Sequence, residues 1–369
     1  MTVSLCMIVK NEENFLDACL SSAAGLFDEL VIVDTGSTDR TKEIAAARGA
    51  KIYDFTWVDD FAAARNYSFS KGTMDYLMWL DADDILKPID RERFAWMKEN
   101  WDPRWDVMAM PYNVAFNETG AVTASFLRER IVRRELFQKG VRWTGAIHEA
   151  LAVDEYAQQI SDVEITHTGE MDGARNLAIL ERQLQTSPDD LRLLYQYAMQ
   201  LMHQEQYDEA IELFHSFLTQ GGGQTVHYVT AMRALYQCYL LKGDPEKAVS
   251  FLDRLLEQGI KTAEVCCQKA DARKDAGDLD GAVRWYWEAT RCPRQLIPGA
   301  MSSPLCYYYT PLFELGRLYL QKTQPELALN CFRLAAKYDD NEEVRQVVER
   351  LEGILGPCSE VTGRVTRKR

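Results

Sequence analysis

Two clusters of acidic side chains stand where this sequence could bind a cation and a ligand. Asp81 and Asp83 are separated by a single residue, and Asp84 follows at once. Two carboxylates at this spacing in an extended turn can reach one hard cation, and such oxygen-rich sites suit Mg²⁺ or Mn²⁺ bridging phosphates. A cation held there would neutralise a departing diphosphate. Asp34 and Asp39 belong to the first acidic cluster in chain order, and Asp81, Asp83 and Asp84 form the second.

Both clusters directly follow segments that we expect to be buried strands. The apolar patterns predict four strands, at residues 5–9, 29–34, 51–55 and 76–80, of which the first is a continuous apolar run. Helical patterns lie between them, at residues 12–24, 41–48 and 61–70. This alternation predicts an α/β domain with a mostly parallel sheet and helices on both faces. Ligands bind beyond the carboxyl ends of the strands in such sheets, so both acidic clusters should lie at the functional edge.

The hydrophobic period changes after about residue 172, and helical spacing replaces the strand patterns. Four segments resemble one another around a shared alanine: Ala210, Ala248, Ala282 and Ala328. Twelve residues before these alanines stand Ala198, Tyr236, Ala270 and Gly316. A period near ~34 residues, with small residues where two helices cross, resembles the tetratricopeptide (TPR) family. A generic helical bundle is the alternative.

The change of period predicts the domain organisation. We expect a catalytic domain at 1–170, a linker helix at 171–188, TPR-like repeats at 189–356 and a basic, flexible tail at 357–369. Residues 1–170 hold 18 Lys and Arg against 29 Asp and Glu, so they carry most of the net charge of −14. This acidic balance argues against nucleic acid as a partner.

The composition also bears on the compartment. No apolar run approaches the ~20 residues of a membrane helix, and the N-terminus has no basic region of a secretory signal. The nine cysteines include no CxxC pair and are odd in number, which favours free thiols in a reducing compartment. We therefore expect a cytoplasmic protein.

Several segments resemble the family-two inverting glycosyltransferases of the GT-A fold. The resemblance is carried by residues 4–13 (SLCMIVKNEE), 31–41 (VIVDTGSTDRT) and 79–84 (WLDADD). Residues 59–66 (DDFAAARN) and 145–149 (GAIHE) resemble motifs of the subgroup with C-terminal TPRs. That subgroup includes enzymes that modify peptides, among them the sublancin-type S-glycosyltransferases. The resemblance thus implies a Rossmann-like GT-A domain followed by an all-α TPR-like domain.

The resemblance also implies roles for individual residues. The nucleotide base and ribose would be held by Val9, Asn11, Glu13 and Asp34. Arg65 would lie near the nucleotide or its phosphates, while Asp81 and Asp83 would engage the ribose and the metal. Asn11 could instead simply begin a helix, and Arg65 could form a surface ion pair.

A basic island interrupts the acidic N-terminal half: Arg128, Arg130, Arg133, Arg134, Lys139 and Arg142. Arg128 and Arg130 alternate along a predicted strand and therefore share one of its faces. A guanidinium matches a diphosphate well, so one or both could contact the donor. The alternative is a strand at the edge of the sheet that carries arginine and glutamate side chains.

Direct displacement at the anomeric carbon needs a base that takes the acceptor proton. We predict Glu149 as this base, with His148 beside it as a second catalytic candidate, although members of the family more often use an aspartate. His167 resembles the late histidine that completes the metal shell in some GT-A enzymes. A structural role is the alternative for His167.

Together with these features, the resemblance implies a hexosyltransferase that moves a sugar, with inversion, from a UDP-linked nucleotide-sugar to a peptide or protein acceptor. Mg²⁺ or Mn²⁺ would be the cofactor, and the TPR half would present the acceptor or mediate a homodimer. A cell-surface glycan or lipid-linked acceptor is the alternative within the enzyme class. Outside it stand a non-catalytic TPR scaffold with a vestigial sugar-nucleotide site and a nucleotidyltransferase. The latter should carry a Gly-rich loop where this chain has residues 10–13 (KNEE).

Overall fold

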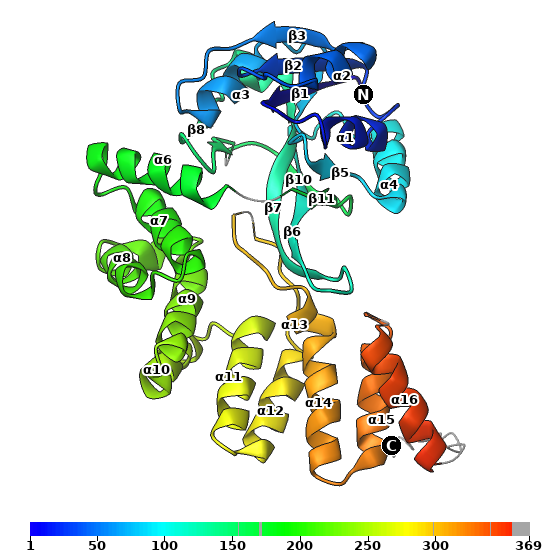
Figure 1. The fold of residues 1–369 in the computed structure, drawn as a ribbon, viewed down its shortest axis with the longest axis vertical. Helices are drawn as coiled ribbons and strands as arrows, with labels where there is room; N and C mark the ends of the chain where they lie inside the picture. Colours follow the sequence, from blue (N-terminus) through cyan, green and yellow to red (C-terminus); the bar gives the residue numbers. More distant parts are fainter. Residues whose placement is uncertain (154, 170–171, 298, 340, 356–369) are drawn as a thin grey trace. The chain divides into compact units, whose positions relative to one another are not determined.

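The computed structural model describes residues 1–153, 155–169, 172–297, 299–339 and 341–355. The basic tail predicted at 357–369 and the first residue of the predicted linker lie outside these ranges. The chain divides into two compact units (Figure 1). Unit 1 comprises Met1–Ala115, Ala124–Asp244 and Leu296–Ser302, and unit 2 comprises Phe116–Thr123, Pro245–Gln295 and Ser303–Arg369. Unit 1 thus contains the sheet together with the first helices of the repeat region.

The first four strands of unit 1 run parallel, as predicted. They are β1 (Val3–Val9), β2 (Glu29–Asp34), β3 (Lys51–Asp54) and β4 (Tyr76–Met78), in the spatial order β3-β2-β1-β4. The helices that connect them are α1 (Leu16–Ser22), α2 (Thr41–Ala47) and α3 (Phe61–Phe69). The first helix begins at Leu16 and not at the predicted residue 12, because residues 11–13 form a loop that bonds to the segment after β2.

Later strands extend the sheet and make it mixed. They are β5 (Asp84–Ile85), β6 (Val107–Phe116), β7 (Val122–Arg133), β10 (Gln158–Ile160) and β11 (Ile165–His167). The full order is β3-β2-β1-β4-β7-β6-β11-β5, and β10 pairs with β6. Strand β7 runs antiparallel to β4, and β11 runs antiparallel to β5. The helices α4 (Pro88–Glu99) and α5 (Arg134–Gln138) and the small ribbon of β8 (Trp143–Thr144) and β9 (Ala150–Leu151) complete this part.

Alternate residues of β1 feed two separate hydrophobic clusters, as the period of a strand requires. Leu5 and Met7 pack on one face with Leu16 of α1 and Phe94 of α4. Cys6 points to the other face, where it packs with Phe69 of α3. Both faces of β1 are therefore covered, which explains its continuous apolar sequence.

Paired helices follow the sheet in the chain. Unit 1 holds α6 (Gly173–Thr186), α7 (Leu191–His203), α8 (Tyr207–Thr219), the 3₁₀ turn η1 (Gly222–Gln224) and α9 (Tyr228–Leu241). Unit 2 holds α10 (Pro245–Glu257), α11 (Ala263–Asp275), α12 (Leu279–Ala289), α13 (Leu305–Tyr308), α14 (Thr310–Gln321), α15 (Pro325–Ala335) and α16 (Glu342–Leu355). Helix α6 falls on the predicted linker helix. This succession of helices agrees with the helical repeat predicted from the sequence.

The residues that defined the repeat lie where helices meet. The four shared alanines are each 0% exposed: Ala210, Ala248, Ala282 and Ala328. Gly316 of α14 faces the ring of Phe332 on α15, and an added Cβ would lie 2.7 Å from that ring. A larger side chain there would force the two helices apart. The small residues therefore mark helix crossings, as predicted.

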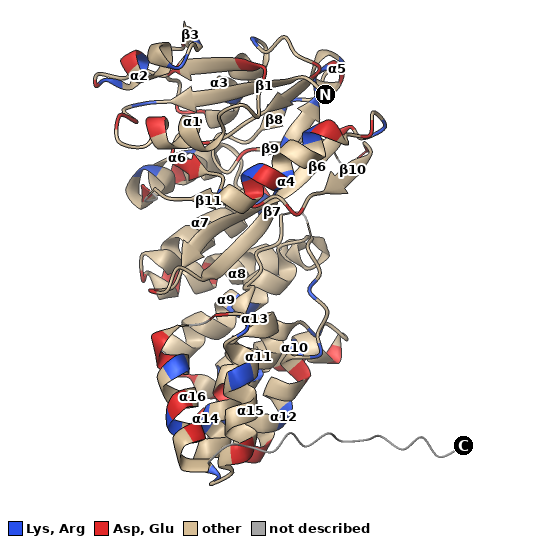
Figure 2. Ribbon diagram, turned by 90° about the vertical axis from the view of Figure 1, so that its right-hand side faces the viewer, with Lys and Arg blue, Asp and Glu red and all other residues tan. Residues whose placement is uncertain are grey.

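The charged surface of the helices is mixed. Figure 2 shows acidic and basic positions interspersed along α14, α15 and α16. Arg333 pairs with Glu352 at 2.6 Å, and Arg317 pairs with Glu314 at 2.9 Å. The eight cysteines of the described ranges are all free thiols. Within the same ranges, no helix is both long and apolar enough to cross a membrane.

Candidate active site

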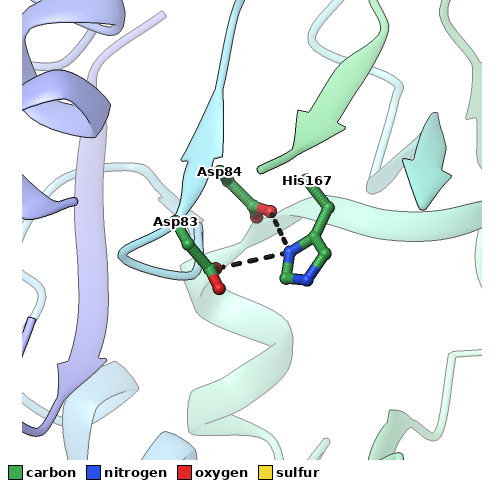
Figure 3. Close-up of side chains that lie close together, drawn as sticks. All are labelled: Asp83, Asp84 and His167. Carbon is green, nitrogen blue, oxygen red and sulfur yellow. Dashed lines mark ion pairs between the residues drawn. The ribbon is translucent and has the colours of Figure 1, made fainter. Parts of the chain in front are cut away.

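Asp83, Asp84 and His167 come together at the end of β4, within the second acidic cluster (Figure 3). Their nearest ligand atoms all lie within 4.8 Å of one another. His167 Nδ1 is 3.4 Å from Asp83 Oδ1 and 3.6 Å from Asp84 Oδ1. The antiparallel pairing of β5 and β11 sets His167 directly opposite Asp84. This strand pairing joins residues that are far apart in the sequence.

The backbone after His167 packs closely against Asp83. Thr168 donates to the Asp83 carbonyl through its backbone N at 2.9 Å and through its hydroxyl at 2.6 Å. A Cβ added to Gly169 would lie only 2.0 Å from Asp83 Oδ2. Residue 169 must therefore be glycine if the Asp83 carboxylate is to keep its place.

Asp84 is anchored from behind by Arg130 of β7. The two side chains are 0% exposed, and Arg130 Nη1 lies 2.9 Å from Asp84 Oδ2. The same oxygen accepts a hydrogen bond from the backbone N of Asp81 at 3.0 Å. The Arg130 guanidinium lies 3.8 Å from the centroid of Trp79 and 4.2 Å from that of Tyr112. Arg130 therefore supports the acidic group from the core.

Arg128 and Arg130 share a face of β7, as predicted, and both stack on Trp79. The alternative of an edge strand is wrong, because β7 lies between β4 and β6. The half-buried Arg128 reaches the backbone carbonyl of Glu149 with Nη2 at 2.9 Å. A contact with a diphosphate stays a prediction for both arginines, and the fully buried Arg130 would need a rearrangement to make one.

The donor set of the three residues suits a divalent cation. Asp84 Oδ1 is buried and has no hydrogen-bond partner among the described residues, so a ligand-type oxygen is left open beside His167. Burial alone would lower the pKa of His167, but hydrogen bonds and attraction from Asp83 and Asp84 outweigh it and raise the pKa to about 10. The two carboxylates thus favour a positive charge beside them. Two carboxylates and an imidazole fit Mn²⁺ or Mg²⁺.

Asp81 is not part of this group of three and pairs with Arg65 of α3. Arg65 Nη2 lies 2.6 Å from Asp81 Oδ1, and Arg65 Nε bonds Glu149 Oε1. The Arg65 guanidinium lies 4.1 Å from the centroid of Trp79. At 5% exposure, Arg65 is no surface ion pair, so that alternative is wrong. Arg65 instead bonds both Asp81, which was predicted to engage the metal, and Glu149, the predicted base.

Glu149 and its neighbour differ in accessibility. Glu149 is 6% exposed, whereas the His148 side chain is exposed and its backbone has a φ of 48°. The described residues provide no hydrogen-bond partner for Glu149 Oε2. The structure therefore joins Glu149 to Asp81 through Arg65, and the catalytic roles of Glu149 and His148 stay predictions.

The residues predicted to bind the nucleotide lie at the ends of β1 and β2 and in the loops that follow, and hydrogen bonds join these two loops. The backbone N atoms of Gly36 and Ser37 each lie 3.0 Å from Asp34 Oδ1. Asn11, at a φ of 57°, accepts from the Thr38 backbone N at 2.8 Å. The Glu13 carboxylate accepts a hydrogen bond from the backbone N of Arg40 at 3.3 Å. The backbone N of Thr35 donates to the carbonyl of Val9 at 2.9 Å.

The ionisation of Asp34 follows from these bonds. Burial alone would raise its pKa, but hydrogen bonds from Ser37 and Gly36 and the nearby Lys42 lower it overall. Asp34 is therefore a fixed carboxylate at the carboxyl end of β2. Its part in binding a ribose stays a prediction.

Three functional candidates were not predicted from the sequence. Glu12 is half-buried near the acidic group, and burial followed by repulsion from Asp83 and Asp81 raises its pKa to about 7. Tyr112 of β6 places its hydroxyl 3.0 Å from His167 Nδ1. Asp84 stood in the second acidic cluster but was not assigned as a ligand. Adjacency to the acidic motif could have pointed to Asp84, whereas Tyr112 needs the strand pairing.

The fold is a Rossmann-like domain with a mixed sheet followed by helical repeats, and comparison with known proteins agrees with this order. Residues 4–100 match the glycosyl transferase family 2, and residues 309–342 match the tetratricopeptide repeat. Residues 4–100 therefore form a family 2 glycosyltransferase domain, and residues 309–342 form a tetratricopeptide repeat.

Individual relatives share parts of the chain. The SPbeta prophage-derived glycosyltransferase SunS of Bacillus subtilis is 24% identical over 226 residues, which are 57% of this chain and 52% of that protein. A TPR repeat-containing protein of Synechococcus elongatus is 50% identical over 84 residues, 23% of this chain and 21% of that protein. The chain thus spans between about a fifth and about half of these relatives. Among solved structures, S. aureus TarS 1-349 has a TM-score of 0.38 and 16% identity, covering 70% of this chain and 92% of that one.

Proposed function

We propose that this chain is an inverting, metal-dependent glycosyltransferase that moves a hexose from a UDP-linked nucleotide-sugar to a peptide or protein acceptor. The observation that carries the proposal is the group of Asp83, Asp84 and His167 after β4 of a family 2 glycosyltransferase domain. Parallel sheets bind ligands at this edge, and an oxygen-rich site there suits a cation that accompanies phosphate groups.

The donor would occupy the edge formed by the first two loops and the second acidic cluster. Asp34, Asn11 and Glu13 line neighbouring turns after β1 and β2, which hydrogen bonds lock together. Fixed carboxylate and amide groups of this kind give a pocket its specificity for polar ligands. The hydrogen bonds to Asp34 lower its pKa, so its carboxylate stays charged and would accept a hydrogen bond from a ribose hydroxyl.

The cation would be held by Asp83 and His167, with the open oxygen of Asp84 as a third ligand. When bound, Mg²⁺ or Mn²⁺ would neutralise the charge of the departing diphosphate. Arg130 fixes the Asp84 carboxylate, and Tyr112 packs against the edge of the His167 ring. Such supporting contacts orient metal ligands and tune their affinity.

Glu149 would accept the proton of the acceptor nucleophile. Arg65 occupies its Oε1 and orients the carboxylate, while Oε2 is free to receive a proton. Attack from this side with departure of the diphosphate on the other inverts the anomeric carbon. His148 is exposed beside Glu149 and could contact the acceptor.

A peptide acceptor is supported by the repeats, because helical-repeat surfaces commonly bind extended chains. The competing acceptor is a cell-surface glycan or a lipid-linked sugar. Incubation with radiolabelled donor and host-cell extract distinguishes them, since protease releases the label from a peptide acceptor only.

Calorimetric titration tests the proposal. UDP-glucose, UDP-galactose, UDP-N-acetylglucosamine and GDP-mannose would be titrated into wild type, Asp83→Ala and the control Asp17→Ala, with Mn²⁺ or with EDTA. Asp17 is an exposed carboxylate of α1 whose partner is Arg48. We expect one UDP-sugar to bind in the presence of Mn²⁺ only, and Asp83→Ala alone to lose it. Binding of no nucleotide-sugar under either condition would contradict the proposal and favour a repeat scaffold.

A further inference from the structure

The loop at 144–149, between β8 and β9, carries the predicted base in an uncommon backbone conformation. Gly145 has a φ of 93°, and His148 has a φ of 48°. A non-glycine residue with positive φ persists only where its surroundings hold it in place. The surroundings of this loop therefore decide where the neighbouring Glu149 points.

Arg192 of α7 bonds both ends of this loop. Its Nη2 donates to the carbonyl of His148, and its Nη1 lies 3.5 Å from the carbonyl of Thr144. The guanidinium also lies over Gly145, where an added Cβ would be 3.1 Å from Nη1. One planar guanidinium can serve two carbonyls in this way, whereas a lysine ammonium lacks the rigid fork.

The start of α7 is itself fixed. Asp190 Oδ1 accepts from the backbone N atoms of Arg192 at 2.9 Å and Leu193 at 3.1 Å, which caps the helix. The loop residues Ala146 and Ile147 are buried in one hydrophobic cluster with Ile179 and Leu180 of α6 and Leu193 of α7. Helices α6 and α7 therefore form a wall for the loop within unit 1.

We propose that Arg192 is a positioning residue for the transfer reaction. By bonding the carbonyls of Thr144 and His148, it holds the loop that presents Glu149 to the acceptor. The first repeat helix is then part of the active site, and a catalytic domain cut at residue 170 lacks it. The inference rests on the proposed function, because Glu149 acts as the base there.

Glu149 is thus restrained from three directions. Arg65 holds its carboxylate, Arg128 holds its carbonyl at 2.9 Å, and Arg192 holds the residue before it. Loss of Arg65 would also disturb Asp81, since it bonds both. Loss of Arg192 should move Glu149 alone and leave the donor side intact, which makes this residue the informative one to change.

Hydrogen exchange and kinetics on the full chain test the proposal, with Arg192→Ala, Arg192→Lys and the control Arg182→Ala. Arg182 pairs with Asp59 at 2.8 Å on the surface and does not bond the loop. In Arg192→Ala, amides 145–149 should exchange at least about tenfold faster, while the melting temperature stays within about 2 °C of wild type. Arg182→Ala should match wild type in both.

The kinetic arm uses the UDP-sugars above, with release of UDP as the signal. We expect kcat of Arg192→Ala to fall about tenfold to a hundredfold while the donor KM changes less than about twofold. A lysine reaches at most one of the two carbonyls, so Arg192→Lys should recover only part of kcat. A merely structural role would not separate kcat from KM.

Unchanged exchange in Arg192→Ala overturns the inference, and so does faster exchange with unchanged kcat. Failure of wild type to turn over any nucleotide-sugar refutes the proposed function, whereas the exchange arm still decides whether Arg192 holds the loop. If Arg192→Ala does not fold, Arg192→Gln replaces it, because a glutamine keeps a polar side chain but lacks the guanidinium fork that reaches both carbonyls. The same exchange and kinetic outcomes then apply.

Discussion

Asp84 and Arg130 form an ion pair in which both side chains are 0% exposed and the joining atoms are 2.9 Å apart. The pair lies behind Asp83 and His167, and it fixes one oxygen of Asp84 while the other stays open towards His167. The acidic group is therefore built on the core of the domain and not on a mobile surface loop. Metal sites depend on such support, because it sets the geometry of the ligands.

Removing one partner of this pair should destabilise the domain strongly. Arg130→Met leaves an unpaired buried carboxylate, which costs about 3–5 kcal/mol of unfolding free energy. The exposed pair of Arg48 and Asp17 provides the control, and Arg48→Ala should cost no more than about 1 kcal/mol. Urea unfolding followed by circular dichroism measures both variants. A smaller loss of unfolding free energy in Arg130→Met than in Arg48→Ala would mean that the buried pair does not stabilise the domain.

Gly169→Ala should damage the cation site without unfolding the protein. The new Cβ would lie 2.0 Å from Asp83 Oδ2, so the carboxylate must move. We expect Mn²⁺ affinity to fall by about 10- to 100-fold in calorimetry. Gly353→Ala is the matched control, because nothing lies within 4 Å of its added Cβ. Equal Mn²⁺ affinity in the two variants would show that Asp83 does not ligate the ion.

Asp81 and His167 should behave differently on substitution. Asp81 was predicted as a metal ligand, yet its carboxylate pairs with Arg65, while His167 contacts both Asp83 and Asp84. We expect His167→Ala to lose at least about tenfold in Mn²⁺ affinity and Asp81→Asn to retain it. Asp81→Asn should instead weaken donor binding. The reverse order of Mn²⁺ affinities would restore Asp81 as the ligand.

Glu29 should make the stability of the domain depend on pH. Burial would raise its pKa, but hydrogen bonds from Lys51, Ser4 and Thr73 outweigh burial and lower the pKa from 4.5 to about 2. A lowered folded-state pKa gives stability that is complete above about pH 4.5 and is lost as the pH falls towards 2.

Glu29→Gln measures this contribution. At pH 7 the variant should lose about 1.5–3 kcal/mol of unfolding free energy, the value of hydrogen bonds to a charged group. The difference from wild type should shrink when unfolding is repeated near pH 3. A difference that is constant or grows on acidification would rule out this assignment.

The parallel strands β1, β2 and β4 could be predicted because they are buried and their sequences are largely apolar. Residues 29–34 were predicted as a strand, and β2 has the same bounds. The start of α1 was misplaced by four residues, because Glu12 donates its backbone N to Thr41 instead of entering the helix. Contacts across the sheet of this kind leave no local pattern in the sequence.

The candidate site was only partly predictable for the same reason. Acidic residues after β2 and β4 follow from strand order, so Asp34 and Asp83 could be named. The bond between Arg65 and Glu149 joins residues 84 positions apart, and only the tertiary fold brings them together. The burial of Arg130 likewise depends on the central place of β7 in the sheet.

The most direct test of the central claim is UDP release from UDP-sugars by wild type and Asp83→Ala, in the presence of host-cell extract. Each protein would be assayed with Mn²⁺ and with EDTA. We expect release by wild type with Mn²⁺, coupled to labelling of a protease-sensitive product, and none with EDTA or in Asp83→Ala. Release that is equal in the variant, or equal in EDTA, would contradict catalysis by a metal held at Asp83.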